Sequence, residues 1–251
     1  MQKSSVLKRH AALRFPGSMG HSVEILVPAQ RYVFAIEDGR AEPQPASTSA
    51  EGFKNFKRLS GEGKVAGMVA FPNCCLIRAA QDYVVDPGII MQGAPVSSSL
   101  SARGIEPHSV TVILTHAHFD HVEALVEFPQ REVFAHELEL DAPYIGFLQG
   151  VLDMVRIKKL SGEEGEIEPG LRWIRTPGHA DGLISVLVDT DDGLVVIASD
   201  CVGPLPEYFD QMDLPEDFGS EREELLRQWQ RIRELDPHMV IPGHNPPVVL
   251  G

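Results

Sequence analysis

The chain has 251 residues and carries 36 acidic against 22 basic side chains, so its formal net charge is -14. This length suits one large domain or two small ones with a substantial core. The negative charge disfavours nucleic acids and anionic membranes as partners, and no window approaches the ~18 continuous apolar residues of a membrane span. The N-terminus has no apolar core of a secretory signal, and we therefore expect a cytoplasmic protein.

The first quarter of the chain reads as short strands separated by turns. Residues 22 to 37 predict two strands around a proline-containing turn. Residues 37 to 60 begin with a run rich in Pro, Ser and Ala, which predicts an exposed loop or insertion. The runs KVAGMVAF, CCLIRAA and DYVVDPG then predict three further strands.

Strands and helices alternate from there to the end of the chain. Helices are predicted over 97 to 106, after REVF, over 143 to 155 and over 220 to 235, where Ser220 would cap the first turn. Strands are predicted at SVTVILT, REVF, GLRWIRT, LISVLVDT, GLVVIAS and HMVIPGH. Many strands come in hairpin-like pairs, which favours a mixed, layered α/β fold over a doubly wound parallel sheet. We expect one domain over residues 1 to 251.

The run THAHFDH directly follows the strand that ends at Thr115. In extended backbone, His116 and His118 project to the same side. If a helix then begins, Asp120 and His121 turn toward a neighbouring point. This spacing differs from HExxH, where one helical face gathers both histidines on one metal, and it predicts two adjacent metal sites.

Three further ligand-type residues each follow a predicted strand. His179 lies in TPGHADG, Asp200 ends VVIASD, and His244 lies in VIPGHNPP. Alone, each is more often an ordinary turn histidine or a strand-end cap. Because ligands gather at the carboxyl ends of strands in α/β sheets, their occurrence together with HxHxDH predicts a binuclear metal site.

In these motifs the chain resembles the metallo-β-lactamase superfamily of binuclear metallohydrolases. The motifs VVDPG, THAHFDH, TPGH, ASD and PGH occur in the family's order, from about residue 65 to the end. The resemblance implies a four-layer αβ/βα sandwich, in which two mixed sheets are flanked by helices and the metals lie at one edge between the sheets.

The resemblance also implies which residues hold which metal. It assigns His116, His118 and His179 to one ion, Asp120, His121 and His244 to the other, Asp200 as a bridge between the two, and Asp86 as a residue that supports the site without binding metal. Two Zn2+ ions suit imidazole and carboxylate ligands, while Fe and Mn stay open as alternatives. Diiron flavoprotein members carry a glutamate in place of His118, which disfavours that type.

Two metal ions about 3.5–4 Å apart can share a hydroxide that attacks a carbonyl or phosphoryl centre. No serine or cysteine nucleophile is then needed. Asp120 is the candidate catalytic residue, since it lies beside the nucleophile and could carry a proton to the leaving group. Cys201 follows Asp200, so strand alternation points it away from the metals, and we interpret it as structural.

Ligand spacing and Phe119 inside the motif most resemble the quorum-quenching N-acyl-homoserine lactonases. The resemblance implies a zinc-dependent hydrolase acting on a lactone or related ester as its small-molecule substrate; similar lactonases are often homodimers. Many of them carry a tyrosine shortly after the bridging aspartate, whereas the nearest here is Tyr208. The apolar stripe at 144 to 155 predicts either a core-facing helix or an acyl-chain wall with Tyr144 and Phe147 near the mouth.

Other activities on the same two metals stay open. A phosphodiesterase or phosphotriesterase is one, and a glyoxalase-II-like thioesterase is another, although the chain ends seven residues after His244 and leaves no room for that group's helical domain. A persulfide-dioxygenase-like enzyme with one iron is less favoured. The absence of a Lys/Arg run near the ligands disfavours a tRNA-processing nuclease, and the complete ligand set disfavours a non-catalytic binding protein.

Overall fold

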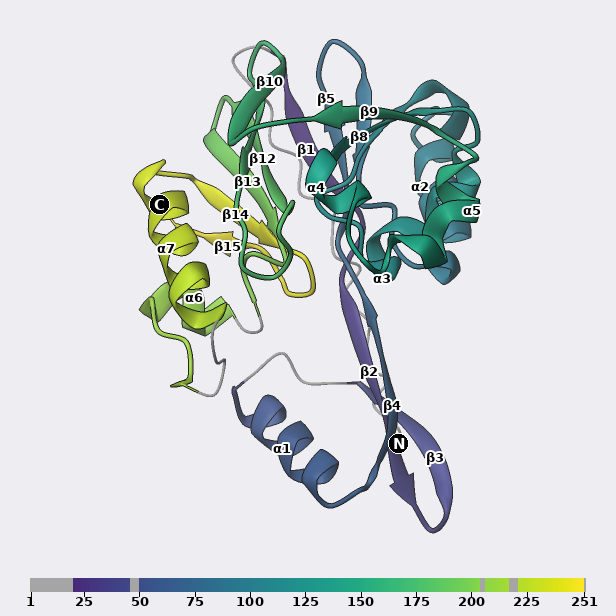
Figure 1. Ribbon diagram of the computed structural model, residues 1–251, viewed down its shortest axis with the longest axis vertical. Coiled ribbons are helices and arrows are strands. Elements are labelled where there is room, and N and C mark those ends of the chain that lie inside the picture. The colour runs from purple at the N-terminus through teal and green to yellow at the C-terminus, as the bar shows by residue number, and fades with distance from the viewer. Residues whose placement is uncertain (1–19, 46–49, 204–205, 217–220, 251) are drawn as a thin grey trace, which may run out of the picture.

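The computed structural model describes residues 20–45, 50–203, 206–216 and 221–250. Two six-stranded sheets pack face to face, and helices cover the outer face of each sheet (Figure 1). The predicted four-layer α/β sandwich is thereby confirmed.

The first sheet contains strands in the order β1-β5-β6-β7-β8-β9. Strands β6 to β9 run parallel to one another, whereas β1, β5 and β6 pair antiparallel. Their bounds are β1 Ser22–Val27, β5 Cys74–Arg78, β6 Asp82–Val85, β7 Thr111–Ile113, β8 Glu132–His136 and β9 Arg156–Leu160. Because β6 and β7 are parallel, their carboxyl ends open at the same edge of the sheet.

The second sheet contains strands in the order β10-β11-β12-β13-β14-β15. Only β13 and β14 are parallel, and the other neighbours are antiparallel. Their bounds are β10 Glu164–Glu168, β11 Leu171–Arg175, β12 Ile184–Thr190, β13 Gly193–Ser199, β14 Met239–Pro242 and β15 Val248–Val249. The carboxyl ends of β13 and β14 therefore also open at one edge.

Short helices connect the strands of the first sheet, and two helices cover the second sheet. Their bounds are α2 Gly93–Ser101, α3 Phe119–Val122, α4 Glu137–Leu140, α5 Gln149–Leu152, α6 Pro206–Gln211 and α7 Glu221–Glu234, with the 3₁₀ helices η1 Ile90–Gln92, η2 Pro107–Ser109, η3 Glu123–Glu127 and η4 Ile145–Leu148. Across the part of the chain that the structure describes, no helix is long and apolar enough to cross a membrane.

The core consists of three apolar layers. One lies between the sheets, and the other two lie beneath the helices on either outer side. Adjacent residues on one strand point into different layers, since Cys74 belongs to the cluster beneath α2 and Cys75 to the cluster between the sheets. Cys201 is fully buried in the cluster beneath α7, which confirms its structural interpretation.

An arm of three strands continues from β1 and β5 and projects away from the two-sheet body (Figure 1). It contains β2 (Gln30–Glu37), β3 (Arg40–Pro45) and β4 (Val65–Phe71), and the helix α1 (Ala50–Gly61) lies between β3 and β4 in sequence. The prediction of a loop over 37 to 60 is wrong, although residues 38 to 44 are exposed as expected.

The arm forms because residues 38 and 39 make a tight turn. Asp38 and Gly39 both have positive φ, at 48° and 74°, which is the backbone of a two-residue hairpin turn. This turn brings Arg40–Pro45 against β2 despite two prolines, which an edge strand such as β3 tolerates.

Two predicted helices have different bounds from those expected. The helix predicted over 97 to 106 begins earlier, as α2 at Gly93. The stretch 143 to 155 is not one α-helix but the 3₁₀ helix η4 followed directly by the short α-helix α5, with Gly146 inside the first and Gly150 inside the second. The last predicted helix is confirmed as α7, while its predicted cap, Ser220, lies outside the described residues.

Candidate metal centre

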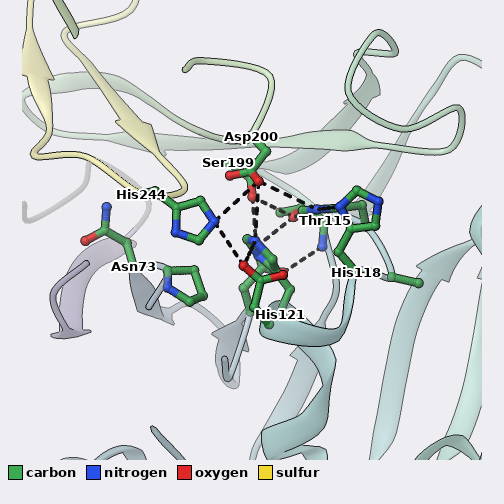
Figure 2. Close-up of polar contacts among 12 residues, drawn as sticks. Asn73, Thr115, His118, His121, Ser199, Asp200 and His244 are labelled. Atoms are coloured by element: carbon green, nitrogen blue, oxygen red, sulfur yellow. Dashed lines mark hydrogen bonds and ion pairs between the residues drawn. The ribbon is translucent and has the colours of Figure 1, made fainter. Parts of the chain in front are cut away.

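The predicted ligands gather where the two sheets open toward each other. They come from the loops after β7, β11, β13 and β14, and Figure 2 shows His118, His121, His244 and Asp200 facing a common centre. A backbone bond from Ile184 N to the Thr115 oxygen (2.9 Å) joins the two sheets beside this centre.

The first ligand group consists of His116, His118 and His179. The Nδ1 atom of His118 lies 3.1 Å from Nε2 of His116 and 2.9 Å from Nε2 of His179. Nitrogen ligands of a tetrahedral zinc ion lie about 2.0 Å from the metal and therefore roughly 3.3 Å from one another. These three nitrogens thus have the mutual spacing of a single metal site.

The second ligand group consists of Asp120, His121 and His244. The Oδ2 atom of Asp120 lies 3.2 Å from Nε2 of His244 and 3.8 Å from Nε2 of His121. The Nε2 atom of His121 is buried and has no hydrogen-bond partner within the described residues. A buried nitrogen without a partner is costly, and a metal ion at this point would satisfy it.

Asp200 lies between the two groups. Its Oδ2 atom is 3.9 Å from Nε2 of His116 and 3.3 Å from Nε2 of His179 in the first group. The same oxygen is 3.7 Å from Nε2 of His121 and 3.4 Å from Nε2 of His244 in the second. A Cβ atom at Gly243 would lie 1.9 Å from the other oxygen of Asp200, so only glycine fits there.

Asp86 supports the second group through hydrogen bonds. Its Oδ2 atom is 2.9 Å from Nδ1 of His121, which directs the opposite nitrogen of that ring to the centre. The same carboxylate accepts bonds from the Thr115 backbone (2.8 Å) and hydroxyl (2.6 Å) and from the Ser199 hydroxyl (3.0 Å). Asp86 also forms a possible ligand group with His116 and His121, although its oxygens are already engaged in these bonds.

Left-handed backbone occurs at two strand ends of this network. Asp86 has φ 50° and Ser199 has φ 49°, and neither residue is glycine. Such conformations cost of order 1–3 kcal/mol each and persist where the surrounding structure requires them. Here the chain turns sharply at the ends of β6 and β13, and both side chains face the ligands.

The charges of the cluster complement one another. Burial disfavours the charged forms of His121 and His244, but nearby carboxylates outweigh it, so that Asp86 and Asp200 raise the pKa of His121 and Asp200 raises that of His244. Burial would raise the pKa of Asp200, yet His244 and His121 hold it well below its usual range. Burial and the neighbouring histidines lower the pKa of His116. Without a metal ion, the carboxylates and the protonated rings of His121 and His244 thus pair with each other. A divalent ion would bind the same carboxylates and the neutral rings, and would displace these protons.

Two polar residues that sequence reasoning missed fix the ligand loops. Asn73 donates its side-chain amide to the backbone oxygens of Pro242 (2.7 Å) and Asn245 (2.8 Å), on either side of His244. Glu139 accepts bonds from the backbone nitrogens of Ala117 and Gly182, both at 2.8 Å. The polar residue between Pro72 and Cys74 was a weak signal for the first, and the sequence carried none for the second.

The predicted pocket residues lie in different environments. The Tyr144 ring packs edge-on against His118, with centroids 4.9 Å apart, and its hydroxyl donates to Glu139 (2.8 Å). Phe119 borders the ligands and is 58% exposed, whereas Phe147 is 94% exposed. Tyr208 lies on α6 and packs against the core cluster beneath α7. Tyr144 and Phe119 thus adjoin the ligands directly.

Arg31 on β2 is a cation near the centre that the sequence did not single out. Burial lowers the pKa of its guanidinium, while the carboxylates of Asp200 and Asp120 act in the opposite direction. The start of β2 is held near the ligand loops because Asn73 accepts a bond from the Ala29 nitrogen (2.8 Å). The arm therefore contributes positive charge to a site whose ligands come from the body.

Comparison with known proteins agrees with this architecture. The sequence profile of the metallo-beta-lactamase superfamily matches residues 68–244. The metallo-hydrolase YqgX of Bacillus subtilis is 29% identical over 188 residues, covering 68% of this chain and 83% of that protein. The metallo-beta-lactamase domain-containing protein 1 of Xenopus laevis is 33% identical over 186 residues, covering 68% and 70%. An N-acyl homoserine lactonase of Bacillus cereus is 25% identical over 154 residues, covering 58% and 60%.

Solved structures share the fold. A metallo-beta-lactamase from Thermotoga maritima superposes with a TM-score of 0.64 at 21% identity, covering 92% of this chain and 99% of that one. The dizinc quorum-quenching lactonase AidC superposes with a TM-score of 0.62 at 16% identity, covering 94% and 90%. With the profile match spanning every predicted ligand, the chain belongs to the metallo-β-lactamase superfamily.

Proposed function

We propose that this chain is a binuclear metallohydrolase, with zinc as the favoured metal, that opens a lactone or cleaves a related ester. The observation that carries the proposal is the position of Asp200. One of its oxygens lies within 3.9 Å of imidazole nitrogens from both ligand groups, as a bridging ligand would.

The two ligand groups would each hold one ion, and Asp200 would contact both. Bound metal ions lower the pKa of water and polarise a carbonyl oxygen, which together make ester bonds susceptible to attack. The protein's part is orientation, since Asp86 fixes the ring of His121 and Thr115 lies 3.1 Å from Nδ1 of His116. These contacts direct the opposite nitrogens to the centre.

Asp120 is the candidate for proton transfer to the leaving group. Burial would raise the pKa of its carboxyl, but the hydrogen bond from His244 and the charge of His121 outweigh burial and lower it. The side chain is therefore ionised near neutral pH and can accept a proton. It is 16% exposed, whereas His121 is fully buried, so Asp120 lies on the side from which a substrate would approach.

A lactone or ester is favoured by similarity and by the apolar border of the site. Several relatives are N-acyl homoserine lactonases, which are 24–25% identical to this chain. The metallo-hydrolase YflN of Bacillus subtilis is 26% identical. Phe119 offers an exposed aromatic ring beside the ligands, which would suit an acyl chain. The small-molecule substrate would lie between this ring and the exposed edge of His179.

A phosphodiester is the second candidate, and Arg31 favours it. A guanidinium close to Asp120 and Asp200 could pair with an anionic substrate after metal ions neutralise the carboxylates. A neutral lactone has no negative charge for Arg31 to pair with. The two candidate substrates thus differ in whether they carry a negative charge that Arg31 could bind.

The test combines metal analysis with a substrate panel on one preparation. The panel contains an N-acyl homoserine lactone, an aryl ester, a thioester and an aryl phosphodiester, and metal content is measured per chain. The matched variants are Asp120→Ala and Asp191→Ala. Asp191 is exposed in the turn before β13, at the opposite end of that strand from Asp200.

We expect about two zinc ions per chain and lactone turnover above the others, lost in Asp120→Ala and kept in Asp191→Ala. Dominant phosphodiester or thioester turnover would retain the metal centre and overturn the lactone. One iron per chain with oxygen consumption would overturn the hydrolase itself.

A further inference from the structure

Glu139 is a buried carboxylate outside the predicted ligand set, and it lies beneath the first ligand group. It belongs to α4, directly after β8, and is 1% exposed. A buried carboxylate must be hydrogen-bonded or paired to be tolerated. Its partners therefore indicate what it holds in place.

Three donors from three segments converge on this carboxylate. The Oε2 atom accepts the backbone nitrogen of Ala117, and Oε1 accepts that of Gly182, each at 2.8 Å. The Tyr144 hydroxyl also donates to Oε2 at 2.8 Å. A Cβ atom at Gly182 would lie 2.8 Å from the Glu139 side chain and backbone, so the loop approaches as closely as only glycine allows.

The two backbone donors lie in the two loops that supply the first group. Ala117 stands between His116 and His118, and Gly182 follows His179 by three residues. The third donor, Tyr144, places its ring against His118. One side chain thus links every segment that contributes a ligand to this group.

No comparable contact joins Glu139 to the second group among the described residues. There the support is Asp86, which contacts the ring of His121 directly. Asp86 also reaches the first group indirectly, because it accepts a bond from the Thr115 hydroxyl, which lies 3.1 Å from Nδ1 of His116. Glu139 contacts the loops of the first group alone among the described residues, so the two buried carboxylates act by different means.

We propose that Glu139 is the positioning residue of the first metal site, setting the spacing of His116, His118 and His179 through the backbone of their loops. This inference rests on the proposed two-metal site and specifies it further. Glu139 does not bind metal or substrate, and it acts only on the geometry of the ligands.

The experiment uses variants that each retain one metal site. His244→Ala removes a ligand of the second group and leaves the first, whereas His179→Ala does the reverse. In each background, the zinc affinity of the remaining site is measured by competition with a chromophoric chelator. Glu139→Gln is then added to both backgrounds, because glutamine keeps the volume but places an NH2 group against a backbone donor. Circular dichroism of the metal-free proteins reports folding.

We expect Glu139→Gln to weaken zinc binding about 10- to 100-fold in the His244→Ala background, the range typical for outer partners of metal ligands. In the His179→Ala background we expect less than a twofold change. Asp86→Asn is the opposite variant. It should weaken zinc binding more in the His179→Ala background, where Asp86 contacts the ring of His121 directly, than in the His244→Ala background, which it reaches only through Thr115.

Equal weakening in both backgrounds, or none in His244→Ala, would overturn the assignment of Glu139. If neither background binds zinc in any form, the proposed metal centre itself fails, which is a separate result. Should Glu139→Gln not fold, Tyr144→Phe decides, since it removes one donor and keeps the ring. We expect it to weaken the first site about 2- to 10-fold, and unchanged affinity would contradict the proposal.

Discussion

The first and second ligand groups use similar side chains but are held differently. The second group is deeply buried at His121, and Asp86 contacts that ring directly. The first group includes His179, whose side chain is 32% exposed, and its loops are held through backbone bonds to Glu139. Holding a loop by its backbone leaves side chains such as His179 free to face solvent, whereas a buried ring needs a partner on its far nitrogen.

The largest effect is expected from removing Asp200, whose carboxylate lies next to both ligand groups. In Asp200→Ala both groups lose their common oxygen, and we expect zinc affinity at each to fall by more than about 100-fold, with turnover lost. Metal content after dialysis and turnover of the preferred substrate check this. Asp191→Ala should behave as the unmodified protein. Two retained ions with normal turnover in Asp200→Ala would show that the groups are independent.

Removing the metal ions should lower the thermal stability of the protein and loosen the loops of the first group more than those of the second. Each site at a hundredfold excess of free metal contributes about 2.7 kcal/mol to stability, so a chelator that empties both proposed sites should lower Tm by roughly 10–20 °C in a chain of this size. Because the first group is more exposed, we expect the Gly182 amide to exchange hydrogen faster than the Thr115 amide, which is bonded to Asp86 at 2.8 Å. Equal exchange rates of the two amides in the metal-free protein would contradict the difference.

A substitution of Arg31 tests whether the positive charge next to the second group recognises an anionic substrate. Its electrostatic partners are Asp120, a member of that group, and the shared Asp200. We expect Arg31→Gln to raise KM for an aryl phosphodiester about tenfold, the loss typical of a charge-assisted hydrogen bond, and KM for a neutral lactone by much less. Arg40→Gln, at the exposed start of β3, is the matched control. An equal rise for both substrates would remove Arg31 from substrate recognition.

The smallest effect is expected at Phe119, the exposed aromatic side chain beside the ligands. Phe119 lies in the chain between His118 of the first group and Asp120 of the second, while Phe147 is almost fully exposed. We expect Phe119→Ser to raise KM for a long-chain lactone about fivefold through lost apolar contact, and Phe147→Ser to stay within about twofold. Steady-state kinetics over a series of acyl-chain lengths checks both. A larger effect at Phe147 would transfer the acyl contact to η4.

Much of the centre could be predicted because its signals are local. His179, Asp200 and His244 were predicted as ligands because each is a polar residue that follows an apolar strand. The structure brings all three into the cluster. The family resemblance of VVDPG implies a supporting role for Asp86, and the structure places Asp86 2.9 Å from the ring of His121. By contrast, the sequence predicts β2 and β4 of the arm as strands but predicts a loop in place of β3. The pairing of β3 depends on the turn at Asp38 and Gly39 and on its edge position, which tolerates prolines.

Glu139 could not be predicted because nothing near it in sequence reveals its environment. In the run ELEL it resembles a solvated acidic residue, yet its two backbone donors lie 22 and 43 residues away in the chain. The apolar stripe at 144 to 155 predicts one helix, whereas the structure has the 3₁₀ helix η4 followed by α5, and Phe147 on η4 is exposed.

The sequence by itself determined the chemistry of the centre, because ligand type is a property of each side chain and strand ends are visible as breaks in a period of two. Only the tertiary structure decided how closely these ligands approach one another, which carboxylate is buried beneath them and which cation approaches from the arm. Those features depend on burial and hydrogen bonds between segments far apart in the chain, which exist only once the two sheets have packed together.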